Sequence, residues 1–175
     1  MHMINANNQK GVGLIEVLVA LLLLAVGVLG YAALQLRAVE ASSEAMTRSQ
    51  ALLVMRSLTE SIRVNVAGQA SYPAAVQSYV NYTSATSAPT SCANSFCTAA
   101  QFATYDAYQS AKSAFVVGMK MTMTNCPGVS SASVKRQCLF GAWGDTTITA
   151  TDYTNCMSTA GVYKSQAKCI MMEAY

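Results

Sequence analysis

Six cysteines are the residues of this chain whose chemistry is easiest to anticipate. None lies in the first 91 residues, and an even number confined to one half of a chain indicates disulfides made in an oxidising compartment. Many pairings are open, and pairing in sequence order is favoured because short loops close at small entropic cost. A metal site is disfavoured, because no C-x-x-C pair occurs and the chain has one histidine. The cysteines are Cys92, Cys97, Cys126, Cys138, Cys156 and Cys169.

The sequence offers little for catalysis. Its one histidine is His2, and its 8 acidic residues form no recognisable pair or metal motif. No G-x-S-x-G or phosphate-loop signature occurs. The formal net charge of +3 is small and the basic residues are dispersed, which disfavours nucleic acid, including transforming DNA, as a partner. We therefore expect no enzyme, no catalytic residue, no metal and no cofactor.

One acidic residue has an unusual position. Glu16 stands at the head of an apolar segment, Val17–Leu36, that carries no charge. An acidic residue in mid-membrane costs about 2.5–3.5 kcal/mol, so a carboxylate there usually has a partner. If the chain is cut after Gly11, the new α-amine of Val12 would lie within about one helical turn of Glu16. The alternative is that Glu16 lies at the membrane interface, where headgroups solvate it.

The segment that follows Glu16 predicts a membrane helix. Val17–Leu36 would span about 30 Å, which matches the hydrocarbon thickness of a bilayer. It is apolar on every face, unlike the core helix of a soluble protein. It is also longer than the apolar region of a secretory signal peptide, which is roughly 7–15 residues. The helix is predicted to continue to Ala67 and to stop at Gly68. An apolar stripe marks its second half: Ala51, Met55, Leu58, Ile62 and Val66.

The remaining sequence predicts a small α+β domain whose strands pack on the second half of the long helix. Thr98 and Gln101 fit a capping box, which starts a helix over residues 99–113 with Phe102 and Tyr105 toward the core. A short helix is expected near residues 74–82. Period-two patterns predict strands at 119–124, 134–143 and 168–174. The predicted organisation is a leader at 1–11, a helix at 12–67 that crosses the membrane at about 13–36, and a cysteine-containing domain at 68–175.

The N-terminal string KGVGLIEVL resembles the class III signal of type IV pilins and pseudopilins. In that family a prepilin peptidase removes a short basic leader after a glycine, and glutamate is the fifth residue of the mature helix. The resemblance implies that Lys10 and Gly11 close the leader and that Val12 becomes the N-methylated N-terminus. It gives Glu16 a role in assembly. The chain departs from the family at Val12, where most members have Phe or Met.

Several segments are similar to the minor pilin family called PilV. They are LIEVLVA at 14–20, VGVLG at 26–30, the Cys92–Cys97 spacing before Thr-Ala-Ala-Gln, and CLFGAW at 138–143. Major pilins often carry a proline in the apolar helix, whereas this chain has Gly-Tyr-Ala-Ala at 30–33. The resemblance implies the type IV pilin fold, with a long N-terminal helix packed against a small antiparallel sheet domain with disulfides.

The resemblance to PilV also implies a function, partners and a location. The function is that of a minor pilin that primes pilus assembly, enters the tip complex and supports twitching motility and adhesion. The partners are other minor pilins, the major pilin, a tip adhesin and the prepilin peptidase. The expected location is a Gram-negative inner membrane, crossed once with the C-terminal domain in the periplasm, and then the surface pilus. The alternative is a GspI-like minor pseudopilin of a type II secretion system, which chain length and cysteine content disfavour.

Overall fold

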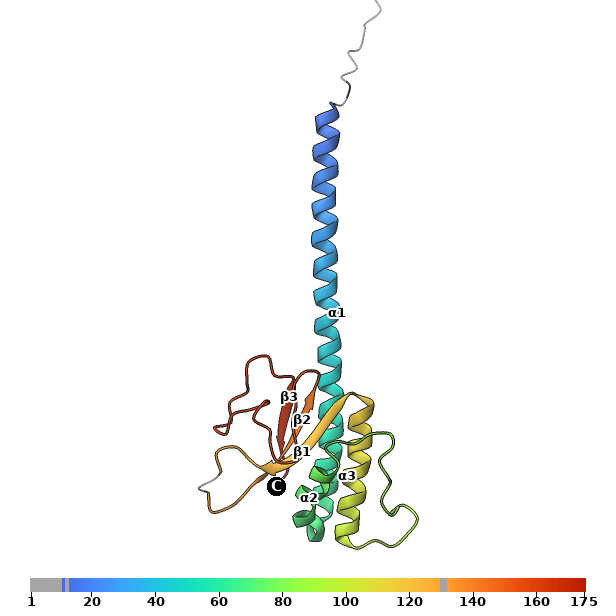
Figure 1. Cartoon of the computed structure of the whole chain (residues 1–175), viewed down its shortest axis with the longest axis vertical. Coiled ribbons are helices and arrows are strands. Elements are labelled where there is room, and N and C mark those ends of the chain that lie inside the picture. The colour runs from blue at the N-terminus through green and yellow to red at the C-terminus, as the bar shows by residue number, and fades with distance from the viewer. Residues whose placement is uncertain (1–10, 12, 130–131) are drawn as a thin grey trace, which may run out of the picture. The chain divides into compact units, whose positions relative to one another are not determined.

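The computed structural model describes residues 11, 13–129 and 132–175. It confirms an α+β fold in which a long N-terminal helix precedes a small antiparallel sheet. Figure 1 shows these elements along the chain and labels the α-helices and the strands. The elements are α1 (Leu14–Val64), η1 (Val66–Ser71), α2 (Tyr72–Ser78), α3 (Ala99–Val116), β1 (Met119–Asn125), β2 (Gln137–Trp143) and β3 (Cys169–Glu173).

The chain forms two compact parts that divide within α1, after Glu44. In the first part, the described residues from Leu14 onward are all helical. Their large apolar side chains are exposed, as Leu22 at 63% and Leu29 at 70% illustrate. Within the described chain, α1 is the one helix long and apolar enough to cross a membrane. Its most apolar window has a mean hydropathy of 2.7 and no buried residue. An apolar surface of this kind is suited to lipid or to other apolar helices.

The second part begins at Ala45 and includes the amphipathic half of α1. Ala51, Met55, Leu58 and Ile62 are each at most 1% exposed and belong to the main core, together with residues of α2, α3 and all three strands. Their spacing of three and four places them on one helix face. Thr59 is also buried on this face. Its hydroxyl donates a hydrogen bond of 2.9 Å to the carbonyl of Met55. The predicted apolar stripe therefore packs against the sheet as expected.

The stripe ends sooner than the sequence indicates. Val66 was expected to continue it but is 69% exposed, because α1 ends at Val64 and the chain enters the 3-10 helix η1. The tighter winding of a 3-10 helix changes the direction of each later side chain. Gly68, expected to stop α1, is instead buried within η1. A Cβ on Gly68 would lie 2.5 Å from the carbonyl oxygen of Ala99, so a glycine is needed for this close approach.

Helix α3 begins as predicted but presents a different face to the core. The backbone N–H of Thr98 donates to Oε1 of Gln101 at 2.8 Å, and the backbone N–H of Gln101 donates to the Thr98 hydroxyl at 3.3 Å. The expectation that Phe102 faces the core is wrong, because Phe102 is 40% exposed, and Tyr105 is half-buried. Small side chains form the buried face and let the helix backbone approach α2, η1 and β1. They are Ala103, Ala107, Ala111 and Ala114.

The three strands form one antiparallel sheet in the order β1-β2-β3. Met121, Gly141 and Ile170 lie side by side across it. Side chains alternate between its faces, so Leu139 and Trp143 of β2 join the main core with the helices. The predicted strands are thus all present, although β2 begins three residues later than expected.

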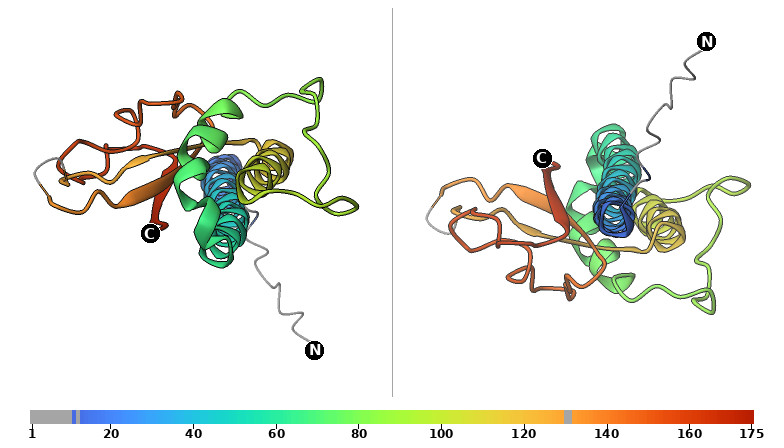
Figure 2. Two further views of the ribbon diagram at one scale, coloured as in Figure 1. Left: turned by 90° about the horizontal axis from the view of Figure 1, so that it is seen from below. Right: turned by 90° about the horizontal axis from the view of Figure 1, so that it is seen from above.

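The opposite face of the sheet is also covered. Residues 144–168, which connect β2 to β3, contribute to a second buried cluster on this face, and Figure 2 shows this connection beside the strands. Phe140 of β2 stacks on Tyr153 of the connection with ring centroids 4.2 Å apart. The hydroxyl of Thr122 donates to the carbonyl of Ala150 at 2.5 Å. The sheet therefore lies between two apolar clusters, with α1 on one side and a long connection on the other.

Candidate functional site

The segment from Gly11 to Glu16 lies at the start of α1. The carbonyl of Gly13 accepts hydrogen bonds from the backbone N–H groups of Glu16 at 2.9 Å and Val17 at 3.3 Å. Glu16 is thus in the first helical turn, where its side chain is exposed. A negative charge there also interacts favourably with the helix dipole, by about 0.3–1 kcal/mol. The helix start alone therefore gives Glu16 a favourable position, apart from any cationic partner.

Two residues of the predicted processing site, Lys10 and Val12, lie outside the described residues. Gly11 is described and exposed. The predicted pairing of the Val12 α-amine with Glu16 therefore stays a prediction. The same holds for cleavage after Gly11 and for N-methylation of Val12.

Arg37 is the first charged residue of α1 after the uncharged segment Val17–Leu36. The guanidinium of Arg37 pairs with Glu40 at 3.0 Å, and both side chains are exposed. Just before it, the side-chain amide of Gln35 donates to the Tyr31 hydroxyl at 2.6 Å. The polar groups near the end of the apolar segment thus bond to each other along the helix surface. This arrangement is suited to a boundary between an apolar medium and water.

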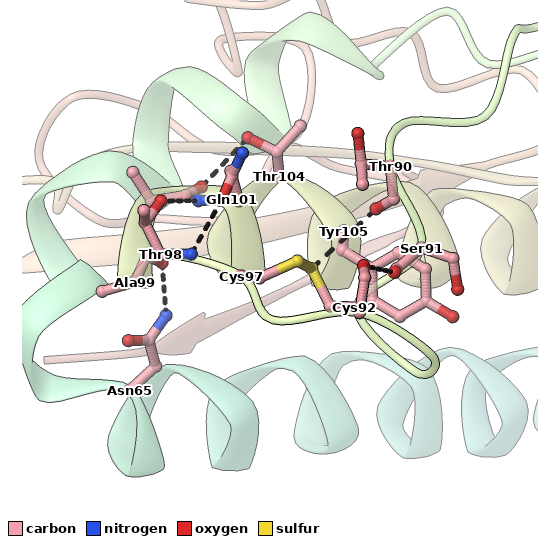
Figure 3. Close-up of a disulfide and its surroundings, with 12 residues drawn as sticks. Asn65, Thr90, Ser91, Cys92, Cys97, Thr98, Ala99, Gln101, Thr104 and Tyr105 are labelled. Carbon is pink, nitrogen blue, oxygen red and sulfur yellow. Dashed lines mark hydrogen bonds between the residues drawn. A yellow bond between two sulfur atoms is a disulfide. The ribbon is translucent and has the colours of Figure 1, made fainter.

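The six cysteines form three disulfides in sequence order: Cys92–Cys97, Cys126–Cys138 and Cys156–Cys169. The last two lie in the second buried cluster and hold the sheet's outer face to the segments that cover it. The first is at the surface, just before α3, and Figure 3 shows it beside the capping box of Thr98 and Gln101. The disulfides thus hold the loops to the sheet and fix the chain where α3 begins.

A hydrogen-bond network that the sequence did not indicate joins Asn65, just after α1, to residues of α2 and α3. The amide of Asn65 donates to the carbonyl of Ala99 at 2.8 Å and to the Tyr72 hydroxyl at 3.3 Å (Figure 3 shows the first contact). The Tyr72 hydroxyl donates to Asp106 at 2.6 Å. No sequence signal marks this contact, because the three side chains come from separate parts of the chain.

Burial shifts the pKa values of two side chains in this hydrogen-bond network, Asp106 and Tyr72. Burial raises the pKa of the Asp106 carboxyl, and the hydrogen bond from Tyr72 opposes that rise. Burial, followed by the hydrogen bond to Asp106, also raises the pKa of the Tyr72 hydroxyl. The raised pKa of Tyr72 keeps its hydroxyl protonated and donating at ordinary pH. No group of three His, Cys, Asp or Glu side chains in the described chain could hold a metal ion.

Two family models match consecutive stretches of the chain. The prokaryotic N-terminal methylation motif matches residues 6–32, and the family described as type IV pilin Tt1218 matches residues 33–108. This part of the chain is that of a type IV pilin. No curated protein and no solved structure matches the chain. The more specific likeness to PilV is not part of either match.

The two matches cover different elements of the structure. The methylation motif covers Gly11, Glu16 and most of the uncharged segment. The pilin family covers the rest of α1, then α2, Cys92–Cys97 and the first half of α3. Type IV pilins are structural proteins, and the combination of an N-terminal methylation motif with an apolar helix is suited to anchoring in a membrane and to a role in pilus assembly.

Proposed function

We propose that this chain is a minor pilin of the PilV kind, which primes assembly of a type IV pilus and enters its tip complex. The observation that carries this proposal is Glu16, in the first turn of α1, five residues after Gly11 and at the head of an uncharged apolar helix. The methylation-motif match over residues 6–32 supports it. The PilV-like strings at 14–20 and 138–143, and the lack of proline in the apolar segment, favour a minor over a major pilin.

Processing would convert the chain from a membrane protein into a subunit. In this proposal the prepilin peptidase cuts after Gly11, and the leader, residues 1–11, is lost. Val12 then supplies a methylated α-amine near Glu16. The mature chain would comprise the long helix, which ends at Val64, and the cysteine-containing domain that follows it. The compact part that begins at Ala45 includes the second half of that helix, which supplies the core with its buried stripe.

The proposed location follows from charge and redox chemistry. Lys10 favours a cytoplasmic position for the segment before the apolar helix, because positive charge stays on that side. The domain with three disulfides would then face the oxidising periplasm of a Gram-negative cell. From the inner membrane the subunit would move into a pilus with other minor pilins, the major pilin and a tip adhesin. In that position it would support twitching motility and adhesion.

A second candidate function is that of a GspI-like minor pseudopilin in a type II secretion system. The observation that favours it is the same N-terminal signal, which both classes would use. The two candidates differ in the filament that the protein enters. Co-purification of the full chain with minor pilins, compared with co-purification with pseudopilins from the same cells, tests which set is its own.

Deletion of the gene is the direct functional test. A minor pilin of this kind predicts few or no surface pili and loss of twitching, with type II secretion unchanged. Complementation with the wild-type chain should restore pili, and complementation with Gly11→Val should not, because the uncut precursor stays in the membrane. Normal piliation together with a secretion defect would instead identify the pseudopilin.

A further inference from the structure

A small aromatic cleft lies between the segment that follows α2 and the junction of α3 with β1. It has a volume of about 390 Å³. The rings of Tyr82 and Phe115 line it, with centroids 5.6 Å apart in an edge-to-face arrangement. Ala111 and Ala114 of α3 also line it, and their small side chains leave the space open. No role described above uses this cleft.

One cation belongs to the cleft. The ammonium of Lys120, on β1, lies 3.2 Å from the side-chain oxygen of Asn81, and both residues line the cleft. Lys120 is the single charged residue of the lining. No acidic residue lines the cleft, and no ion pair joins Lys120 to another residue that the structure describes. The cleft thus combines aromatic walls with an exposed ammonium that a hydrogen bond to Asn81 holds at its edge.

We propose that this cleft binds a large apolar or aromatic side chain of a neighbouring pilin subunit, one that stands beside an acidic residue. The side chain would lie against the rings of Tyr82 and Phe115 on the side that lines the cleft, where edge-to-face contacts are favourable. The carboxylate would meet Lys120, which supplies the complementary charge. This inference rests on the proposed pilin function, which makes other pilin subunits the neighbours of this domain.

The cleft is large enough to hold one side chain. Sites for small molecules have volumes of about 300–1,000 Å³, and this cleft is near the lower limit. One apolar side chain of the neighbouring subunit and the carboxylate beside it would fill this space. As a free ligand, so few atoms would bind only weakly. At a subunit interface the same group acts as an anchor, because the surrounding contacts exclude water from it. Exposed aromatic side chains beside the cleft are suited to that purpose, and Phe115 is 48% exposed.

Photo-crosslinking of the full chain in cells that make the pilus tests the proposal. Phe115 is replaced by p-benzoylphenylalanine, which keeps an aromatic ring at the wall of the cleft. The matched control carries the same replacement at Phe102, which is on the same helix, is 40% exposed and lies outside the cleft. We expect Phe115 to crosslink to a second protein with an N-terminal methylation motif. The attached peptide should contain a large apolar residue next to Asp or Glu.

Charge variants test the role of Lys120. Lys120→Glu should lower the yield of the Phe115 crosslink about fivefold, since an exposed ion pair contributes up to about 1 kcal/mol and reversal adds repulsion. Lys120→Arg should keep the yield. Lys112→Glu, the same reversal at an exposed position of α3 that does not line the cleft, should also keep it. Reversing the acid of the partner to Lys should restore the crosslink of Lys120→Glu.

Several results would overturn the proposal. These are a Phe115 crosslink to lipid or to a protein without the motif, a crosslinked peptide without an acidic residue, no crosslink at all, or a yield that Lys120→Glu leaves unchanged. Failure of the pilin function is distinguishable, because the precursor would then remain uncut after Gly11. If only the cleft is misassigned, the chain is cut and enters pili while Phe115 gives no crosslink. Thermal unfolding of Lys120→Glu, followed by Trp143 fluorescence, shows that the variant is folded.

Discussion

The sulfur of Met55, on α1, lies directly against Gly141 in the middle of β2. A Cβ on Gly141 would lie 2.8 Å from this sulfur and 2.8 Å from that of Met119. The glycine thus creates the space in which the long helix packs on the sheet. Gly141→Ala should lower the free energy of unfolding by about 1–3 kcal/mol through overpacking. Thermal unfolding of the full chain in detergent, followed by the fluorescence of buried Trp143, measures the change.

A double variant checks the cause of that loss. Met55→Ala alone should cost about 2–5 kcal/mol, because it leaves a cavity. In Met55→Ala with Gly141→Ala, one of the two sulfurs that crowd the new methyl group is absent, so the combined loss should be smaller than the sum of the two single losses. Additive losses would show that Met55 does not press on Gly141.

Tyr72→Phe should destabilise the protein by about 1–3 kcal/mol at pH 7, because it removes the hydrogen bond to a carboxylate that is partly buried. Burial raises the pKa of Asp106 above its ordinary 3.8, so the folded state holds this proton more tightly than the unfolded state. The contribution of Asp106 to stability is then highest below the unfolded pKa and falls as pH rises through the folded pKa.

Tyr72→Phe should raise the pKa of Asp106 further, since the hydrogen bond from Tyr72 lowers it in the wild type. The loss of stability should therefore be larger at pH 7 than at pH 4. Unfolding curves at both pH values measure it. Tyr105→Phe, which removes an exposed hydroxyl bonded to Gln109, is the matched control and should change stability little at either pH. Equal losses at both pH values for Tyr72→Phe would contradict the role of Asp106.

The three disulfides should differ in their reaction with a mild reductant. Cys92 and Cys97 are partly exposed, whereas the other four cysteines are at most 7% exposed. Reductant therefore reaches the first disulfide without unfolding. Maleimide labelling of the native chain, read by mass spectrometry, should find modification at Cys92 and Cys97 first. Early labelling of Cys156 or Cys169 would contradict the packing of the sheet's outer face.

The cost of removing each disulfide should follow the length of its loop. In the chain-entropy estimate, a separation of 5 residues is worth about 2 kcal/mol and a separation of 13 about 3 kcal/mol. Cys156→Ser with Cys169→Ser should therefore destabilise more than Cys92→Ser with Cys97→Ser. Two buried hydroxyls in an apolar cluster add to this difference. Thermal unfolding of the two paired variants gives the comparison.

Glu16→Gln separates two explanations of the acid at the start of α1. If Glu16 pairs with the Val12 amine in a bundle of helices, the amide leaves that ammonium uncompensated. Breaking a buried ion pair costs about 3–5 kcal/mol, and half of that lowers incorporation by roughly tenfold or more. The variant should still be cut and inserted. The amount in sheared pili, normalised to the membrane level, measures incorporation.

Glu40→Gln is the control for this experiment. It removes an acid from the same helix, but Glu40 forms an exposed pair with Arg37, and such pairs contribute about 0–1 kcal/mol. Its incorporation should match the wild type. Wild-type incorporation of Glu16→Gln would favour the interface position for Glu16 and remove the charge-pairing role.

The long helix, the capping box of α3 and the three strands could be predicted because each depends on a local pattern. Periodicity located Met55 and Leu58 in the core, and Thr98 with Gln101 fixed where α3 begins. The face of α3 could not be predicted in this way. Aromatic side chains such as Phe102 bury more area, but close helix packing selected Ala103 and Ala107 instead. Which of the two governs depends on the distance between elements, which the sequence does not contain.

The polar contacts depended on tertiary structure as well. Asn65, Tyr72 and Asp106 come from three separate parts of the chain, and their hydrogen bonds exist only because α1 ends at Val64 and the chain turns through η1. The sequence indicated a stop at Gly68, four residues later. Gly68 is required for a different reason, the close approach of Ala99.

Because β2 has a buried cluster on each face, it tolerates changes of length poorly. One inserted residue before Leu139 would exchange the faces of the side chains that follow, bringing Phe140 toward α1 and Trp143 toward the connection. No such constraint holds for residues 84–91, which lie between α2 and α3 outside any helix or strand and include no buried residue. Related chains should therefore vary in length within this stretch and keep β2 free of insertions and deletions. The same stretch is the natural place for an inserted epitope tag.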